Sequence, residues 1–315
     1  MKLLFENWRK YLEEAFADIG TGITSKVPIH ASKGLEVIEK YGDRVWIFLD
    51  IETTGFSKRK ETITEIAAIA IDPNDWTTEP EIKSTFSQKG KLSPYVRSRE
   101  PESESAIEMR KVMAMTRYGE KDAPEGRYIP EKEMIEKFYD WVEQFGDVVL
   151  VIQNAKFDMG FISIRYLADP ITGKATGKGS VGRELPRYPV IDTVPIFKNY
   201  LIPYLKTLAK AGDTEAEAFL GRSIGKSGKP ASASLGALGK AYDIPIIGWH
   251  SAVEDIKILM SIFQKTVEKI REMGDVDIRG EFPKKKPLTR AARLKKIRAK
   301  QKRAAKKRKA EAGTP

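Results

Sequence analysis

The 315-residue chain contains no cysteine, only two histidines and no apolar run near the roughly 18 residues that a membrane-spanning helix needs. The absence of cysteine excludes disulfides and thiolate metal sites, so only oxygen atoms and the two imidazoles could bind a metal. The first twenty residues carry several charged side chains and lack the pattern of a signal peptide. We therefore expect a soluble, intracellular (cytoplasmic) protein that does not associate with a membrane.

Positive charge is concentrated in one segment. The net charge is +11, yet residues 284–309 alone contain 15 lysines and arginines, and Glu311 is the one acid after them. The tail 284–315 is therefore +14, which leaves residues 1–283 slightly acidic at −3. A basic segment favours a polyanionic partner, most often nucleic acid, with a solvated tail or an acidic protein partner as the alternatives. We expect residues 284–309 to contact the nucleic acid backbone.

The apolar patterns predict one α/β domain over residues 44–275, built on a mixed sheet flanked by helices. Short polar links between the first three predicted strands are typical of antiparallel neighbours. The predicted strands are Val45–Leu49, 64–72, 81–88 and Val148–Ile152, and the predicted helices begin at Glu131, after Asn154 and at Ala252, the last one running to Met273.

The remaining segments are assigned to appendages and insertions. Residues 1–43 combine an amphipathic helix with a linker, and residues 276–315 form a basic C-terminal tail. The stretch GRSIGKSG resembles a phosphate-binding loop, but Gly221 and Gly225 are separated by three residues where four are required, so we reject that interpretation. Stretches that look like inserted loops are residues 91–130, 168–187 and 210–233.

Two acids follow the first predicted strand. Because alternate residues of a strand point to the same face, the carboxylates of Asp50 and Glu52 project together. Neighbouring anions repel unless a cation lies between them, and hard oxygen ligands select magnesium or manganese. A strand that ends in surface acids is the structural alternative. The sequence TTG that follows favours a site, because small residues let a ligand approach the backbone closely.

Two further acids lie near predicted helix starts. Asp158 follows a predicted strand, and Asp255 lies about one turn inside the last predicted helix, five residues after His250. Each acid taken alone is explained by the preference of helix N-termini for negative charge. Four carboxylates at strand ends and helix starts, Asp50 and Glu52 included, could instead hold two divalent ions about 4 Å apart, the arrangement used in phosphodiester cleavage.

Short motifs in the chain carry a family resemblance. DIETTG at 50–55, NAKFD at 154–158 and HSAVED at 250–255 resemble the three exonuclease motifs of the DEDD superfamily, in its histidine-containing, DnaQ-like branch of 3′–5′ exonucleases. IDT at 191–193 is similar to that family's fifth-strand element. The resemblance covers roughly residues 44–273 and implies a ribonuclease H-like fold.

The resemblance also implies roles for individual residues. The four acids would bind two magnesium or manganese ions, and His250 would be the general base that takes a proton from the attacking water. An imidazole pKa near 6.5 suits that role, while magnesium's preference for oxygen makes His250 a weaker candidate as a metal ligand. Residues that would lie against the terminal nucleotide are Thr53, Thr54, Gly55, Asn154 and Phe157.

The implied function is hydrolysis of the terminal phosphodiester at a free 3′ end, with release of nucleoside 5′-monophosphates. DNA is favoured over RNA, and a polymerase or another replication protein is the expected partner. The alternatives are an exoribonuclease and a non-catalytic nucleic-acid-binding protein on a nuclease scaffold. The chain departs from many relatives at Gln153, where they have histidine, and at Ser251, where they have an acidic or amide residue.

Overall fold

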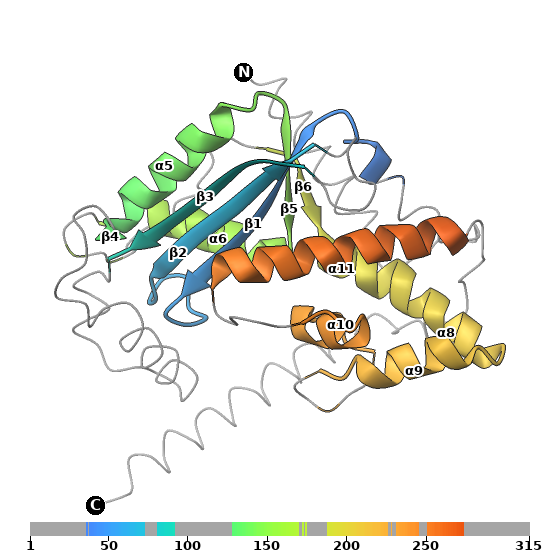
Figure 1. Ribbon diagram of the computed structural model, residues 1–315. Helices are drawn as coiled ribbons and strands as arrows, with labels where there is room; N and C mark the ends of the chain where they lie inside the picture. The colour runs from blue at the N-terminus through green and yellow to red at the C-terminus, as the bar shows by residue number, and fades with distance from the viewer. Residues whose placement is uncertain are drawn as a thin grey trace, which may run out of the picture. The chain divides into compact units, whose positions relative to one another are not determined.

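A six-stranded sheet forms the centre of the computed structural model, in the order β4-β3-β2-β1-β5-β6 (Figure 1). Strand β2 is antiparallel to both β1 and β3, as the short links predicted, and the other pairs are parallel. This is the mixed sheet that the sequence predicts; the short β4 was not predicted. The strands are β1 (Val45–Thr53), β2 (Ile63–Ile71), β3 (Ile82–Gly90), β4 (Tyr128–Ile129), β5 (Val148–Ile152) and β6 (Val190–Asp192).

The description covers residues 36, 38–72, 81–91, 128–169, 172, 174, 188–225, 228, 231–245 and 251–273. These residues belong to one compact unit, Val27–Ile278. The predicted N-terminal helix, most of the stretches 91–130 and 168–187, and the basic tail lie outside the described residues.

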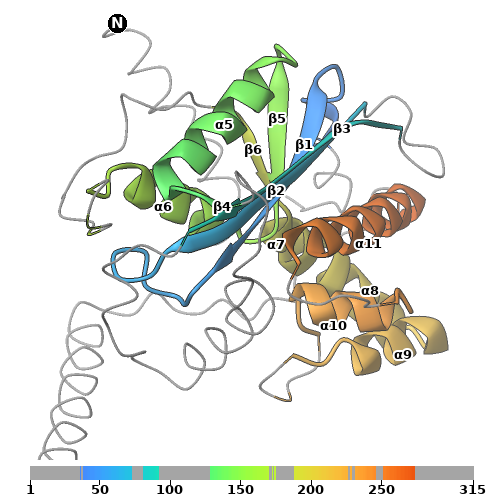
Figure 2. The same ribbon diagram turned by 60° about the vertical axis from the view of Figure 1, so that its left-hand side comes forward.

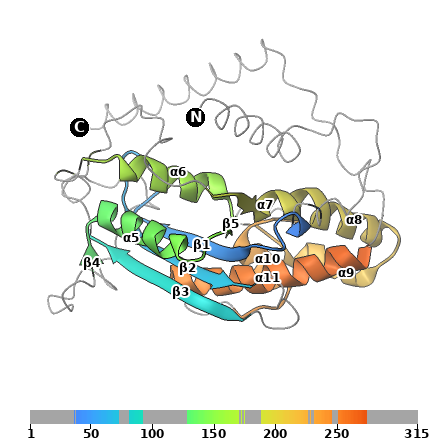
Figure 3. The same ribbon diagram turned by 90° about the horizontal axis from the view of Figure 1, so that it is seen from above.

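Helices cover both faces of the sheet. Helices α5 and α6 pack on one face and α11 on the other (Figure 3), while α10 contacts α11 and α9, and α9 contacts α8 (Figure 2). Among the described helices, none is both long and apolar enough to cross a membrane. The helices are α5 (Glu131–Glu143), α6 (Ala155–Tyr166), α7 (Thr193–Ile196), the π-helical turn η3 (Phe197–Leu201), α8 (Ile202–Lys210), α9 (Thr214–Arg222), α10 (Leu235–Ala241) and α11 (Ala252–Met273).

Part of a predicted insertion is helical. Residues 214–222 form α9, so the expectation of a loop across 210–233 is wrong there. The side chain of Asp213 caps the helix by accepting a hydrogen bond from the backbone N–H of Ala216 at 2.9 Å. The buried side of α9 consists of Ala216 and Phe219. The glycine-, lysine- and serine-rich sequence that follows hid this short amphipathic pattern.

Alternation along β1 divides its side chains between the two helical layers. Ile47 and Leu49 are fully buried in the apolar core that includes residues of α5 and α6. Trp46 and Phe48 point to the opposite face, where each ring centroid lies 5.9 Å from that of Phe263 in α11. Strand β1 is therefore buried on both faces, as its continuous apolar run predicts.

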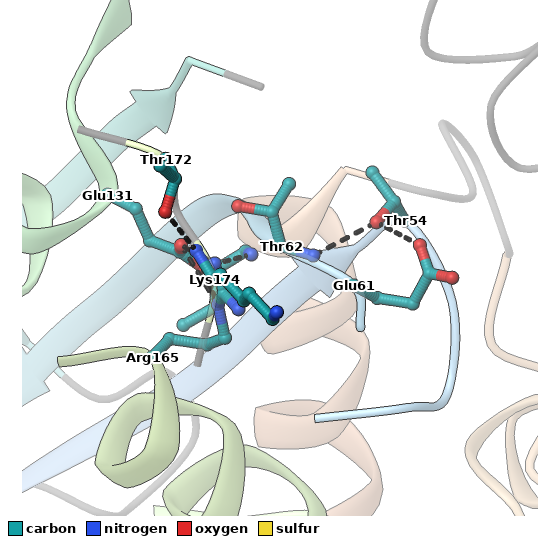
Figure 4. A network of polar contacts seen from close by, with 8 residues as sticks. Thr54, Glu61, Thr62, Glu131, Arg165, Thr172 and Lys174 are labelled. Atoms are coloured by element: carbon teal, nitrogen blue, oxygen red, sulfur yellow. Dashed lines mark hydrogen bonds and ion pairs between the residues drawn. The ribbon is translucent and has the colours of Figure 1, made fainter. Parts of the chain in front are cut away.

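A buried ion pair ties the α5 and α6 layer to the sheet (Figure 4). The Nη2 atom of Arg165 in α6 donates to Oε2 of Glu131 at 2.7 Å, and its Nε donates to Oε1 and Oε2 at 3.0 Å. Glu131 Oε1 also accepts a hydrogen bond from the backbone N–H of Ile63, at the start of β2, at 2.6 Å. Because both side chains are buried, neither charge can rely on water in place of its partner.

Removing one partner should therefore destabilise the fold. We expect Glu131→Ala to lower the free energy of unfolding by about 3–5 kcal/mol, because it leaves a buried guanidinium without its carboxylate. Chemical denaturation measures the change. The matched control is Glu136→Ala, which removes an exposed carboxylate 3.9 Å from Lys132 on the same helix and should cost less than about 1 kcal/mol. Equal losses in the two variants would contradict the structural role of the buried pair.

Candidate active site

Asp50 and Glu52 extend the face of β1 that is turned toward α11. They continue the alternating series of Trp46 and Phe48, so they point to the side on which Phe263 packs. Glu52 is 7% exposed and Asp50 is partly buried. One face of β1 therefore carries first the two aromatic residues that contact α11 and then the two acids.

Asp255 approaches these acids from α11. It lies in the first turn of the helix, whose start is marked by a hydrogen bond from its backbone N–H to the carbonyl oxygen of Ser251 at 3.0 Å. Phe263 lies eight residues later, close to the same face of the helix. Since Phe263 packs on Trp46 and Phe48, the register of that apolar contact sets Asp255 beside the acidic end of β1.

The three carboxylates form a cluster. Asp50, Glu52 and Asp255 each offer an oxygen atom, and these three atoms lie within 4.8 Å of one another. The set consists of hard anionic oxygens, at the spacing that a shared divalent cation requires, so these residues fit magnesium or manganese.

Asp158 approaches the cluster from the other helical layer. Strand β5 runs parallel to β1 and pairs with it up to Ile152, and α6 begins three residues later. Asp158 lies in the first turn of α6 and is 2% exposed. After burial, its negative charge is the largest cause of the raised pKa of Asp50.

The electrostatics of the site show strong mutual repulsion. Burial, followed by the charges of Asp158, Glu52, Asp255 and Glu65, raises the pKa of Asp50 well above its usual value. Burial also raises the pKa of Asp158 well above its usual value, although backbone N–H groups and the charge of a nearby lysine oppose the shift. Burial, Glu254 and Glu65 raise the pKa of Asp255 to about 6.

Threonine hydroxyls make hydrogen bonds within the loop that follows β1. The hydroxyl of Thr54 donates to Glu61 Oε2 at 2.7 Å and accepts from the backbone N–H of Thr62 at 3.0 Å (Figure 4). The hydroxyl of Thr53 donates to the carbonyl oxygen of Gly55 at 2.9 Å. These hydroxyls therefore shape the loop, because their hydrogen bonds are made within it.

The turn between β5 and α6 positions the second predicted motif. Asn154 adopts a left-handed conformation, with φ 66°, and its backbone N–H donates to Oδ1 of Asp192 at 3.1 Å. The same oxygen accepts from the N–H of Val194 at 3.1 Å, so Asp192 joins the turn to the start of α7. The ring of Phe157 contacts that of Phe56, with centroids 6.3 Å apart.

The two residues that depart from the family pattern, Gln153 and Ser251, both make hydrogen bonds in the structure. Gln153 donates from Nε2 to the carbonyl oxygen of Ala233 at 2.8 Å, and its Oε1 accepts from the hydroxyl of Thr193. It therefore links β5 to α7 and to the segment before α10. Ser251 supplies the carbonyl that begins α11. His250 lies outside the described residues, so its predicted role as the base stays a prediction.

Sequence reasoning missed three residues around the cluster. Glu65 of β2 is 2% exposed, stands opposite Glu52 in the strand pairing, and acts on the pKa values of two of the acids. Phe56 is 68% exposed beside Phe157. Lys58 acts on the pKa of Asp158. The position of Lys58 and Phe56 just after the TTG sequence was the available signal, whereas Glu65 looked like an ordinary strand residue.

Comparison with known proteins agrees with this geometry. Residues 47–168 match the RNase_T family model, which is described as an exonuclease. This part of the chain is therefore similar to exonucleases. The match agrees, for residues 47–168, with the predicted resemblance to the DEDD 3′–5′ exonucleases. The histidine-containing branch stays a prediction.

Relatives of the exonuclease domain occur in larger proteins. The DNA polymerase III PolC-type of Staphylococcus aureus is 28% identical over 255 residues, which cover 81% of this chain and 13% of the polymerase. The exonuclease I structure from Methylocaldum szegediense has a TM-score of 0.44 at 20% identity and covers 73% of this chain and 42% of that one. E. coli exonuclease I in complex with a dT13 oligonucleotide has a TM-score of 0.47 at 15% identity, with the same coverage.

Repulsion in the cluster leads to a prediction that can be tested by thermal stability, without an activity assay. We expect Asp50→Asn to raise the melting temperature in EDTA at pH 8 by roughly 2–8 °C, because it removes a charge that folding brings among other anions. The pKa of Asp50 is raised on folding, so its ionisation destabilises the folded state as pH rises above the usual value near 3.8. The gain should therefore shrink toward pH 4.

The same variant tests the metal site. Mg²⁺ should raise the melting temperature of the unmodified protein and have much less effect on Asp50→Asn, since a ligand has been lost. Asp140→Asn, which neutralises an exposed acid in α5, is the control and should behave like the unmodified protein. A lower melting temperature for Asp50→Asn in EDTA, or an undiminished response to Mg²⁺, would contradict the assignment.

Proposed function

We propose that this protein is a metal-dependent 3′–5′ exonuclease that hydrolyses the terminal phosphodiester of DNA and releases nucleoside 5′-monophosphates. The convergence of Asp50, Glu52 and Asp255 to within 4.8 Å, inside an exonuclease domain, carries the proposal. DNA is favoured because the sequence relative named above is a DNA polymerase. We also propose a replication polymerase as a partner and residues 284–309 as a contact to the nucleic acid backbone.

The four acids would hold two magnesium or manganese ions. Divalent ions bound there would supply positive charge to the phosphodiester and make water a better nucleophile. Asp50, Glu52 and Asp255 would bind from the α11 face of β1, and Asp158 from the first turn of α6. Because these ligands come from a buried strand and two helix starts, the protein fixes their geometry before any ion binds.

The remaining residues would orient the substrate and move the proton. The loop of Thr53, Thr54 and Gly55 and the turn of Asn154 and Phe157 would lie on either side of the terminal nucleotide. His250 would accept the proton of the attacking water as the new P–O bond forms. The bond from phosphorus to the 3′ oxygen breaks, and that oxygen leaves with the shortened strand after gaining a proton.

The activity is tested with labelled single-stranded DNA and Mg²⁺. A 5′-labelled oligonucleotide should yield a ladder of shortening products, and a 3′-labelled one should release labelled mononucleotide at the earliest times. Asp50→Ala should reduce the rate by at least about 100-fold, because it removes a proposed ligand. DNA should be degraded faster than RNA of matched sequence. No shortening beyond that of Asp50→Ala would favour a non-catalytic nucleic-acid-binding protein instead.

The role of His250 has a separate test. We expect His250→Ala to lower kcat by about 10²–10⁴-fold, because the attacking water loses its base, while calorimetric Mn²⁺ affinity changes little. Proton acceptance by an imidazole also predicts a rate that rises with pH through its pKa in the unmodified protein. Collapse of metal affinity, with the rate preserved at saturating metal, would make His250 a ligand and contradict the assignment.

A further inference from the structure

Lys58 lies on the loop between β1 and β2, next to the proposed active site. Its ammonium donates a hydrogen bond to the carbonyl oxygen of Lys156, in the first turn of α6. Two residues earlier on the loop, the ring of Phe56 contacts that of Phe157 in the same turn. Two contacts thus connect the loop that follows Asp50 and Glu52 to the helix that carries Asp158.

The path of Lys58 depends on a glycine in α6. A Cβ atom at Gly160 would lie 2.9 Å from Cε of Lys58, 3.1 Å from Cδ and closer still to Nζ. The lysine side chain therefore crosses the helix where a side chain is missing. Gly160 lies inside a regular helix and does not have a positive φ, so its backbone conformation does not require glycine. The close approach of Lys58 explains why a residue without a side chain stands here.

The ammonium of Lys58 lies near a proposed metal ligand. It contacts the carbonyl oxygen of Lys156, two residues before Asp158 in the first turn of α6. Two divalent ions would balance four ligand carboxylates, which leaves the negative charge of a phosphodiester without a counter-charge at the site. Glu65 adds another negative charge nearby. A cation at the edge of the cluster would supply the missing compensation.

We propose that the ammonium of Lys58 contacts a non-bridging oxygen of the scissile phosphate, with Gly160 providing the space that brings it there. The inference rests on the proposed exonuclease function. An ammonium has three N–H donors, and the hydrogen bond to Lys156 fixes its direction. The contact strengthens as negative charge develops on the phosphate during attack, so Lys58 acts on kcat as well as on binding.

Three variants separate this role from a structural one. Lys58→Met keeps a similar chain and removes the charge. Gly160→Ala keeps the charge but displaces the ammonium, and it favours the helix, so its effect is not one of unfolding. Arg59→Met removes an exposed cation from the same loop and serves as the matched control. Single-turnover cleavage of a 5′-labelled oligonucleotide with Mg²⁺ measures the rates, and fluorescence anisotropy in EDTA measures binding of the same strand.

Lys58→Met should slow cleavage by about 10- to 100-fold and weaken binding in EDTA several-fold, because a charge-assisted contact is lost. Gly160→Ala should slow the unmodified protein but have no further effect in the Lys58→Met background, and Lys58→Arg should restore part of the rate. Arg59→Met should stay within about twofold on both measures.

Equal rates for Lys58→Met and the unmodified protein would overturn this proposal alone, as would a Gly160→Ala effect that persists in the Lys58→Met background. An unmodified protein no faster than Asp50→Ala would overturn the exonuclease function itself. The two failures are therefore distinguishable.

Discussion

Mutual repulsion among buried and half-buried carboxylates is the constraint that the packing of this fold has to overcome. Asp50, Glu52 and Asp255 bring oxygens within 4.8 Å of one another, and Asp158 and Glu65 add to the negative potential at Asp50. Like charges at such distances oppose folding and, after burial, they raise the pKa values of Asp50 and Asp255. Apolar packing elsewhere must hold them together, since no interaction between the acids themselves does so.

That packing comes from both faces of one strand. On one face, Trp46 and Phe48 contact Phe263, which fixes α11 and thereby Asp255. On the other face, the core between β1, β5, α5 and α6 fixes the start of α6 and thereby Asp158. The cluster therefore forms where two helices, packed on opposite faces of the sheet, both begin beside the end of β1. A disturbance of either layer would move one of these carboxylates relative to the others.

Sequence patterns predicted the elements whose periodicity was strong. The run Val148–Ile152 and the helix Ala252–Met273 occur with the predicted bounds, because each has a continuous or regularly spaced apolar face. The antiparallel order of the first three strands followed from link length. Strand β4 has two residues and helix α9 has nine, and both lie in polar sequence, so neither carried enough periodic signal. The four acids were predicted from their positions after strands and at helix starts, and the structure brings three of them into one cluster.

The residues that surround those acids could not be found in the same way, because their roles depend on contacts distant in sequence. Glu65 is an acid inside an otherwise apolar strand, and only the pairing of β1 with β2 places it opposite Glu52. Its Oε2 lies 3.5 Å from the backbone nitrogen of Ala252, at the start of α11. Glu65 thus adds repulsion to the cluster and also accepts a hydrogen bond from the helix that carries Asp255. An apolar residue at this position of β2 would avoid the repulsion, but it would leave the backbone N–H of Ala252 without its acceptor. Glu65 is therefore best explained by the position that it gives to α11 and not by a gain in net stability.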